Sequence, residues 1–223
     1  VDYLVWMVSL GGAICYPLLP FGPPVPTSFL VAIKAAGVGM LALLVFRQAG
    51  RRGRSLDTFG LGVALSLSCL GDVFLALRVR NGFVYGLSSF LAAHLIYFAL
   101  FSRRWLRPLH SPLIRLGGTA ALLIFSVFFF RWLAPGLGEL ALPVMIYVCA
   151  ITLMVTAALW AHLSTRLAVI GAVLFMVSDS ILAVDRFRGA MALSGLLIWT
   201  TYYLGQYGIT MGFLTDFHDE EEK

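Results

Sequence analysis

Residues 140–161 read LALPVMIYVCAITLMVTAALWA, a stretch without a single Asp, Glu, Lys or Arg. The hydrocarbon core of a bilayer is about 30 Å thick, and a helix needs about 20 apolar residues to cross it. The apolar residues here are continuous and do not alternate with polar ones, which favours a helix over a strand of a membrane barrel. The stretch therefore predicts a membrane-spanning helix.

Seven further stretches have the same character: residues 3–19, 27–46, 56–77, 83–101, 112–133, 167–185 and 190–214. The first stretch has no basic region before it and no small-residue cleavage site, so we expect a span and not a signal peptide. The connections are short and rich in Gly, Pro or Arg, which leaves no room for an inserted soluble domain. We predict an all-α polytopic membrane protein, with an eight-helix transmembrane domain over residues 1–215 and an acidic tail over residues 216–223.

The composition excludes a soluble globular protein. Of the 223 residues, 60% are hydrophobic and only 12% are charged, about half the roughly 25% of charged residues in average proteins. Cys15, Cys69 and Cys149 are odd in number and widely spaced, which argues against a disulfide framework or a CxxC metal site. The net charge of +5 comes from arginines that flank the spans and face lipid head groups, so it does not indicate nucleic-acid binding.

Basic residues in the short loops predict the orientation. Eight spans place both termini on one side, and most arginines lie there: Arg47, Arg51, Arg52, Arg54, Arg103, Arg104, Arg107, Arg115 and Arg166, against Arg78, Arg80, Arg131, Arg186 and Arg188 on the other. Because cytoplasmic loops carry the excess of Lys and Arg, we expect cytoplasmic termini and a multi-pass location in a bacterial inner membrane or an ER-type membrane.

Few ionisable side chains lie away from the ends of the predicted spans: Lys34, Asp72, His94 and Asp179, with Asp185 at an edge. Each costs about 2.5–3.5 kcal/mol near the bilayer centre, so each needs a reason. At 1.5 Å per residue, Lys34, Asp72 and Asp179 all lie about 8–10 Å from the non-cytoplasmic ends of their helices, and His94 lies about 16 Å deep. Three charged groups on different helices are thus predicted to share one level of the membrane.

The two aspartates are stronger candidates for a catalytic role than the other polar residues of the spans. Lys34 can be a simple counter-ion, His94 a hydrogen-bond donor between helices, Tyr202 a packing aromatic, and Ser178 a small residue that lets helices approach. One lysine, however, neutralises only one carboxylate, so the other must be protonated or partnered by water. A close pair of carboxyls would titrate jointly, as in general acid–base catalysis.

Several familiar catalytic patterns are absent from the sequence. There is no HExxH or other group of closely spaced zinc ligands, and no GxSxG nucleophile motif. The pair of aspartates resembles intramembrane aspartyl proteases only weakly, because Cys69 stands where a GxGD motif needs its first glycine and no YD motif occurs. These absences argue against a zinc hydrolase, a serine hydrolase of the GxSxG type and a peptidase.

The chain resembles the YhhN-like transmembrane proteins, the lysoplasmalogenases. The resemblance is carried by segments of helices two to eight in order: Ala32–Lys34, Ser68–Leu75, Phe90–Tyr97, Leu142–Val144 with Tyr147, Gly171–Asp179 with Asp185 and Phe187, and Thr200–Tyr203 with Gln206.

The resemblance implies an enzyme that hydrolyses the vinyl-ether bond of a lysophospholipid substrate. The products would be a fatty aldehyde and glycerophosphoethanolamine or glycerophosphocholine. The resemblance implies no metal or organic cofactor; membrane lipids would be partners, and no obligate protein partner is implied. By analogy with paired-carboxylate glycosidases, Asp72 and Asp179 would act as acid and base in an undetermined order. Supporting or substrate-binding roles would fall to the remaining polar residues of the spans: Lys34, His94, Tyr147, Ser178, Tyr202 and Gln206.

Two other classes compete with the enzyme. A small proton-coupled transporter or channel would use the same buried Asp, Lys and His groups, and a structural or lipid-binding protein would have no need of them. The enzyme reading predicts that the two carboxylates lie within about 6 Å, in direct or single-water reach. It also predicts an elongated apolar slot beside them, lined by Phe74, Phe90, Leu91, Phe175 and Trp199.

Overall fold

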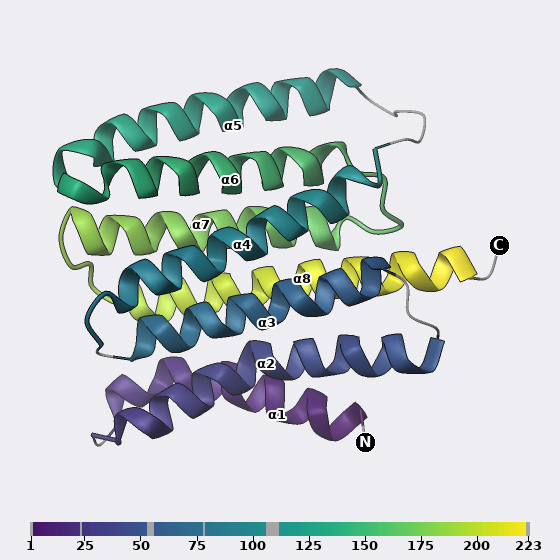
Figure 1. The fold of residues 1–223 in the computed structure, drawn as a ribbon, viewed down its shortest axis with the longest axis horizontal. Coiled ribbons are helices and arrows are strands. Elements are labelled where there is room, and N and C mark those ends of the chain that lie inside the picture. Colours follow the sequence, from purple (N-terminus) through teal and green to yellow (C-terminus); the bar gives the residue numbers. More distant parts are fainter. Residues whose placement is uncertain (1, 23, 53–55, 78, 106–111, 222–223) are drawn as a thin grey trace. The chain divides into compact units, whose positions relative to one another are not determined.

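A computed structural model describes residues 2–22, 24–52, 56–77, 79–105 and 112–221 of the chain, and all regular elements in these ranges are helical (Figure 1). Eight α-helices and three short 3₁₀ helices follow one another: α1 (Asp2–Cys15), η1 (Tyr16–Phe21), α2 (Thr27–Arg52), α3 (Leu56–Ala76), α4 (Gly82–Ser102), α5 (Pro112–Leu133), η2 (Ala134–Gly136), η3 (Gly138–Leu140), α6 (Ala141–Trp160), α7 (Leu167–Phe187) and α8 (Ser194–Glu221).

The chain divides into two compact units. Unit 1 comprises Val1–Tyr97 with Phe213–Lys223, and unit 2 comprises Phe98–Gly212. The helices α4 and α8 each begin in one unit and end in the other. The predicted division into one transmembrane domain and a tail stays a prediction. In the structure α8 continues to Glu221, and Asp216, assigned to the tail, is a buried residue of this helix.

In unit 1, α1 and α2 approach closely through small residues. A Cβ atom on Gly12 would lie 2.9 Å from the carbonyl oxygen of Ile33, so only glycine fits there. The Ser9 hydroxyl donates to the carbonyl of Gly37 at 2.6 Å across the same contact. Close approach of small residues is the usual way in which membrane helices gain packing energy where lipid supplies no hydrophobic drive.

The α3 helix packs against both α2 and α4. Phe46 of α2 lies against Gly62, and Phe90 of α4 lies against Gly71, one glycine for each large ring. A methyl group at Gly71 would meet the Phe90 ring at 2.6 Å. Because Gly71 precedes Asp72, this contact sets the rotation of α3 at the aspartate.

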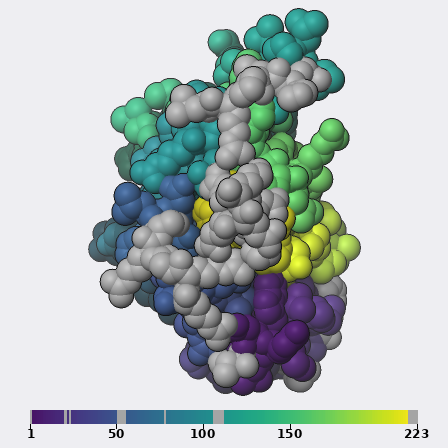
Figure 2. Space-filling model, turned by 90° about the vertical axis from the view of Figure 1, so that its right-hand side faces the viewer, coloured from purple at the N-terminus to yellow at the C-terminus, as the bar shows by residue number. Residues whose placement is uncertain are grey.

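In unit 2, α5, α6 and α7 lie side by side (Figure 1). Hydroxyl and indole groups join α5 to α6: Ser126 and Thr152 hydrogen-bond at 2.8 Å, and the Trp160 indole donates to Thr119 at 2.8 Å. The opposite face of α5 is apolar and exposed, with Leu113 and Ile114 about four-fifths exposed, and the first turns of this helix stand at the surface in Figure 2. Such a face is suited to lipid.

Backbone contact joins α7 to α8. A Cβ atom on Gly171 would lie 2.6 Å from both the Gly205 carbonyl oxygen and the Ile209 nitrogen, and one on Gly205 would lie 2.9 Å from the Gly171 carbonyl oxygen. The two helices are therefore packed at the closest distance that glycine permits.

Each predicted span coincides with an α-helix of the described residues, with local differences. The first span ends in the 3₁₀ helix η1 because Pro17 and Pro20 interrupt α-helical hydrogen bonding. Seven helices of the described chain are long and apolar enough to cross a membrane, which defines a multi-pass membrane protein. The exception is α8, whose middle carries Thr200 to Tyr203 and Gln206. Of the arginines used for the orientation, Arg54, Arg78 and Arg107 lie outside the described residues.

Candidate functional site

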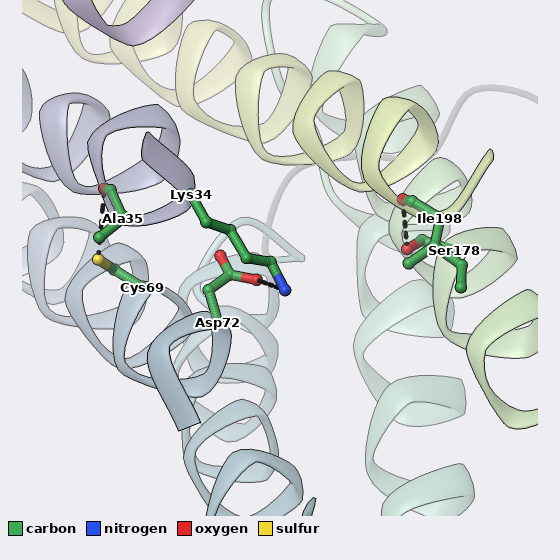
Figure 3. Close-up of polar contacts among 6 residues, drawn as sticks. All are labelled: Lys34, Ala35, Cys69, Asp72, Ser178 and Ile198. Atoms are coloured by element: carbon green, nitrogen blue, oxygen red, sulfur yellow. Dashed lines mark hydrogen bonds and ion pairs between the residues drawn. The ribbon is translucent and has the colours of Figure 1, made fainter. Parts of the chain in front are cut away.

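An ion pair in unit 1 joins two of the predicted site residues. Lys34 Nζ of α2 lies 3.3 Å from Asp72 Oδ1 of α3, and the two side chains are only 12% and 3% exposed. Figure 3 shows the lysine side chain extending from α2 toward the carboxylate. Opposite charges this close compensate much of the cost of placing each in a poorly hydrated interior. Lys34 is therefore the counter-ion of Asp72, and its expected position beside both aspartates stays a prediction.

Two neighbours hold this ion pair in place. The Lys34 ammonium lies 5.5 Å from the centre of the Tyr16 ring of η1, within the range of a cation–π interaction. One turn before Asp72, Cys69 donates its thiol hydrogen to the Ala35 carbonyl at 3.5 Å (Figure 3), which ties α3 to the turn of α2 that carries Lys34. Tyr16 was not among the predicted site residues. It lies near the end of the first predicted span, and only the fold brings its ring to Lys34.

A second polar group of unit 1 lies between α3 and α4. His94 is fully buried, as are Ser68 and Tyr97. Ser68 precedes Asp72 by four residues, and Tyr97 follows His94 by three, so each pair shares a helix face. This spacing was a signal in the sequence that could have added Ser68 and Tyr97 to the predicted site.

In unit 2 the second aspartate accepts a hydrogen bond from the neighbouring helix. The Tyr147 hydroxyl of α6 donates to Asp179 Oδ2 of α7 at 2.5 Å. Tyr147 is 7% exposed and Asp179 is half-buried. Bonds of this length are typical of a hydroxyl that donates to an ionised carboxylate.

The α8 helix contacts the residues of α7 that neighbour Asp179. Ser178 donates its hydroxyl to the Ile198 carbonyl of α8 at 2.9 Å (Figure 3). Phe175, one turn before Asp179, meets Tyr202 edge-on at a centroid distance of 5.2 Å, and Trp199 lies 5.7 Å from the same tyrosine ring. Gln206 is fully buried one turn further along α8.

The structure thus brings the predicted residues together in two groups. Lys34 and Asp72 lie in unit 1, and Tyr147, Ser178, Asp179 and Tyr202 lie in unit 2. The approach of Asp72 to Asp179 concerns both units and stays a prediction, and so does the apolar slot beside them. Of the five side chains predicted to line that slot, Phe90, Phe175 and Trp199 are buried, and Phe74 and Leu91 are half-buried.

No group of three or more His, Cys, Asp or Glu side chains comes together among the described residues in the way that metal ligands would. The three cysteines are free thiols. Chemistry without a metal or cofactor stays a prediction.

Membrane-length helices that carry a carboxylate–ammonium pair and a carboxylate–phenol pair define a polytopic membrane protein with paired polar groups inside its helices. The chain belongs to the YhhN family, whose model matches residues 29–213.

Named relatives support this assignment. The chain is 36% identical over 188 residues to a lysoplasmalogenase of Mycobacterium bovis, which covers 82% of this chain and 69% of the relative. It is 35% identical over 176 residues to lysoplasmalogenase TMEM86B of Rattus norvegicus, covering 78% and 70%. The human TMEM86B protein is 34% identical over 158 residues, covering 68% and 62%. No solved structure matches the chain significantly.

Proposed function

We propose that this protein hydrolyses the vinyl-ether bond of lysoplasmalogens. The observation that carries the proposal is the similarity, at 35–36% identity over about four-fifths of the chain, to bacterial and mammalian proteins named lysoplasmalogenase. The products are a fatty aldehyde and glycerophosphoethanolamine or glycerophosphocholine. The substrate is a lysophospholipid, which reaches the site from the membrane.

The chemistry requires an acid and a water molecule. A proton is added to the β-carbon of the vinyl ether, which leaves an oxocarbenium ion at the carbon bonded to oxygen. Water adds to that carbon and loses a proton, and the resulting hemiacetal collapses to aldehyde and alcohol. Carbon protonation is slow in neutral water, so a carboxylic acid held in a dry site accelerates it.

Asp72 and Asp179 are the residues proposed for these proton transfers. One carboxyl donates the proton to carbon, while the other stabilises the cation and accepts a proton from water, as the two carboxyls of a glycosidase do. Their surroundings support such roles, because each is held by a side chain from a neighbouring helix, Lys34 for Asp72 and Tyr147 for Asp179.

The other polar residues would serve the substrate and the water. Lys34 either keeps Asp72 ionised or contacts the phosphate of the head group. His94, Tyr202 and Gln206 are buried and would orient water and the head group, while Ser178 holds α7 against α8 through its bond to Ile198.

We propose eight spans, with α8 as the last and both termini in the cytoplasm. The glycine contacts with α7 support a transmembrane α8, because they pair residues 205–212 with an apolar helix. Two of its hydroxyls are also satisfied within the helix: Thr201 donates to the Leu197 carbonyl and Thr210 to the Gln206 carbonyl. These bonds lower the cost of polar residues in lipid.

The decisive experiment uses purified protein in detergent and measures aldehyde release from a lysoplasmalogen. Asp72→Asn and Asp179→Asn keep the size of the side chain and remove the acid, so each should lower the rate by about 100- to 10,000-fold, the usual contribution of general acid–base catalysis. Asp185→Asn is the matched control, since Asp185 accepts the Met191 amide in the α7–α8 connection; it should keep most of the activity.

Two outcomes would contradict the proposal. Wild-type turnover by Asp72→Asn or Asp179→Asn protein would remove the two-aspartate mechanism. An absence of aldehyde from the wild-type protein in detergent, together with proton-coupled flux in sealed vesicles, would favour the transporter.

A further inference from the structure

The hydrogen bond between Tyr147 and Asp179 has the geometry of a positioning contact. The phenol lies on α6 and the carboxyl on α7, with 2.5 Å between the two oxygens. This is the short end of the 2.5–2.7 Å expected for an O–H donor to a carboxylate, and such bonds are about twice as strong as neutral ones. Tyr147 is nearly buried, so little water competes for the bond.

The backbone around Asp179 is already held by its neighbours. Ser178 is anchored to the Ile198 carbonyl, and Phe175, fully buried, packs edge-on against Tyr202. These contacts restrict the rotation of α7 at Asp179. The Tyr147 bond acts on the orientation of the carboxyl group, because it engages one specific oxygen, Oδ2.

We propose that Tyr147 is a positioning residue that orients the Asp179 carboxyl for proton transfer. The inference rests on the proposed function, in which Asp179 exchanges a proton with substrate or water. It narrows the supporting role expected from the sequence: Tyr147 acts through Asp179 and is not a substrate contact.

A positioning role predicts a particular kinetic pattern. Misplacement of a catalytic group by about 1 Å costs about 100-fold in rate, and the loss of a hydrogen bond to a charged group corresponds to about ten- to a hundredfold. Tyr147→Phe should therefore lower kcat by about ten- to a hundredfold. KM should stay within about twofold, because the substrate does not touch the phenol.

The experiment compares wild type, Tyr147→Phe and Asp179→Asn with a matched control, Thr152→Val. Thr152 lies on the same helix, and its buried hydroxyl bonds Ser126 and the Val148 carbonyl. Its loss should lower the melting temperature and leave kcat unchanged. Binding of a saturated 1-O-alkyl lysophospholipid, which lacks the vinyl double bond, measures affinity without turnover and should be equal in wild type and Tyr147→Phe.

Incorporation of 4-aminophenylalanine at position 147 tests the donor itself. This residue keeps the ring and places an N–H donor near the position of the hydroxyl, so it should restore kcat to at least about a third of the wild-type value if orientation by a hydrogen bond is what matters. It also retains the shape of the side chain should Tyr147→Phe fail to fold.

The possible results separate the inference from the proposed function. Full kcat in Tyr147→Phe, with Asp179→Asn inactive, overturns the positioning role and leaves the proposed function standing. A raised KM and weaker binding of the alkyl analogue with unchanged kcat also overturn it, because Tyr147 is then a substrate contact. The positioning role is also overturned if the 4-aminophenylalanine variant has a kcat as low as that of Tyr147→Phe. An active Asp179→Asn protein instead refutes the two-aspartate proposal.

Discussion

At the scale of single residues, the charged groups of the candidate site each lie beside a polar or oppositely charged partner. Lys34 and Asp72 form an ion pair at 3.3 Å with both side chains nearly buried, and Asp179 accepts a short bond from Tyr147. The contrast is the pair of Arg47 and Asp2, whose charged atoms lie 3.9 Å apart with both side chains 36% exposed. Loss of one partner should cost more stability in the first pair than in the second, because the side chains of the second pair are more exposed to water.

Replacement of Lys34 by methionine should destabilise the protein by about 3 kcal/mol, because it leaves the Asp72 carboxylate buried without its cation. The double variant Lys34→Met, Asp72→Leu should regain most of that loss. Arg47→Met is the control and should cost less than about 1 kcal/mol, as exposed pairs do. Unfolding in detergent measures all three, and equal losses for Lys34→Met and Arg47→Met would contradict the argument.

At the scale of helices, glycine contacts join α7 to α8 in unit 2, and hydrogen bonds between hydroxyl groups join α5 to α6. Gly171 and Gly205 let the α7 and α8 backbones touch, while α5 meets α6 through Ser126 and Thr152. The α7–α8 contact matters for the site, since it carries Phe175 and Asp179 on one helix and Trp199 and Tyr202 on the other.

Gly171→Ala should lower stability by about 1–3 kcal/mol, the usual cost of overpacking, because the new methyl would lie 2.6 Å from backbone atoms of α8. Gly117→Ala makes the same chemical change on α5 where nothing lies within 4 Å. It should be neutral or raise stability by up to about 1 kcal/mol through helix propensity. A melting temperature that falls as much for Gly117→Ala as for Gly171→Ala would refute the packing argument.

At the scale of the whole molecule, α8 is the helix on which the topology depends. Seven helices of the described residues are long and apolar enough to cross a membrane, and α8 does not meet that criterion by itself. With α8 across the membrane, the C-terminus and the α6–α7 connection lie on the same side, and the α7–α8 connection lies on the other.

Single cysteines at Ser164 and Gly189, both exposed in these two connections, should show this topology in a cysteine-free background. A membrane-impermeant thiol reagent added to intact cells should label Gly189→Cys and not Ser164→Cys, and a reporter fused to the C-terminus should behave as cytoplasmic. A C-terminal reporter on the same side as Gly189→Cys would show that α8 does not cross.

The positions of the helices could be read from the sequence with small errors, because membrane insertion depends on a local property, the apolarity of about 20 consecutive residues. Residues 140–161 were predicted as a span and form α6, Ala141–Trp160. The ionisable residues Asp72 and Asp179 were equally visible, because a charge inside an apolar run stands out against its neighbours. The errors lie at helix ends, as at η1, where prolines change the hydrogen bonding.

Which side chains contact these charged residues could be learned only from the tertiary structure. Tyr147 could be named from the sequence, but its bond to Asp179 requires a particular rotation of α6 against α7. The contact of Tyr16 with Lys34 requires η1 to fold back over α2. Helix rotation and neighbour choice result from the summed packing of many side chains, such as Gly71 against Phe90 and Gly171 against Gly205. No short segment of sequence determines this packing. Hydropathy therefore locates the charged residues along the chain, while the packing of the helices determines which side chains they contact.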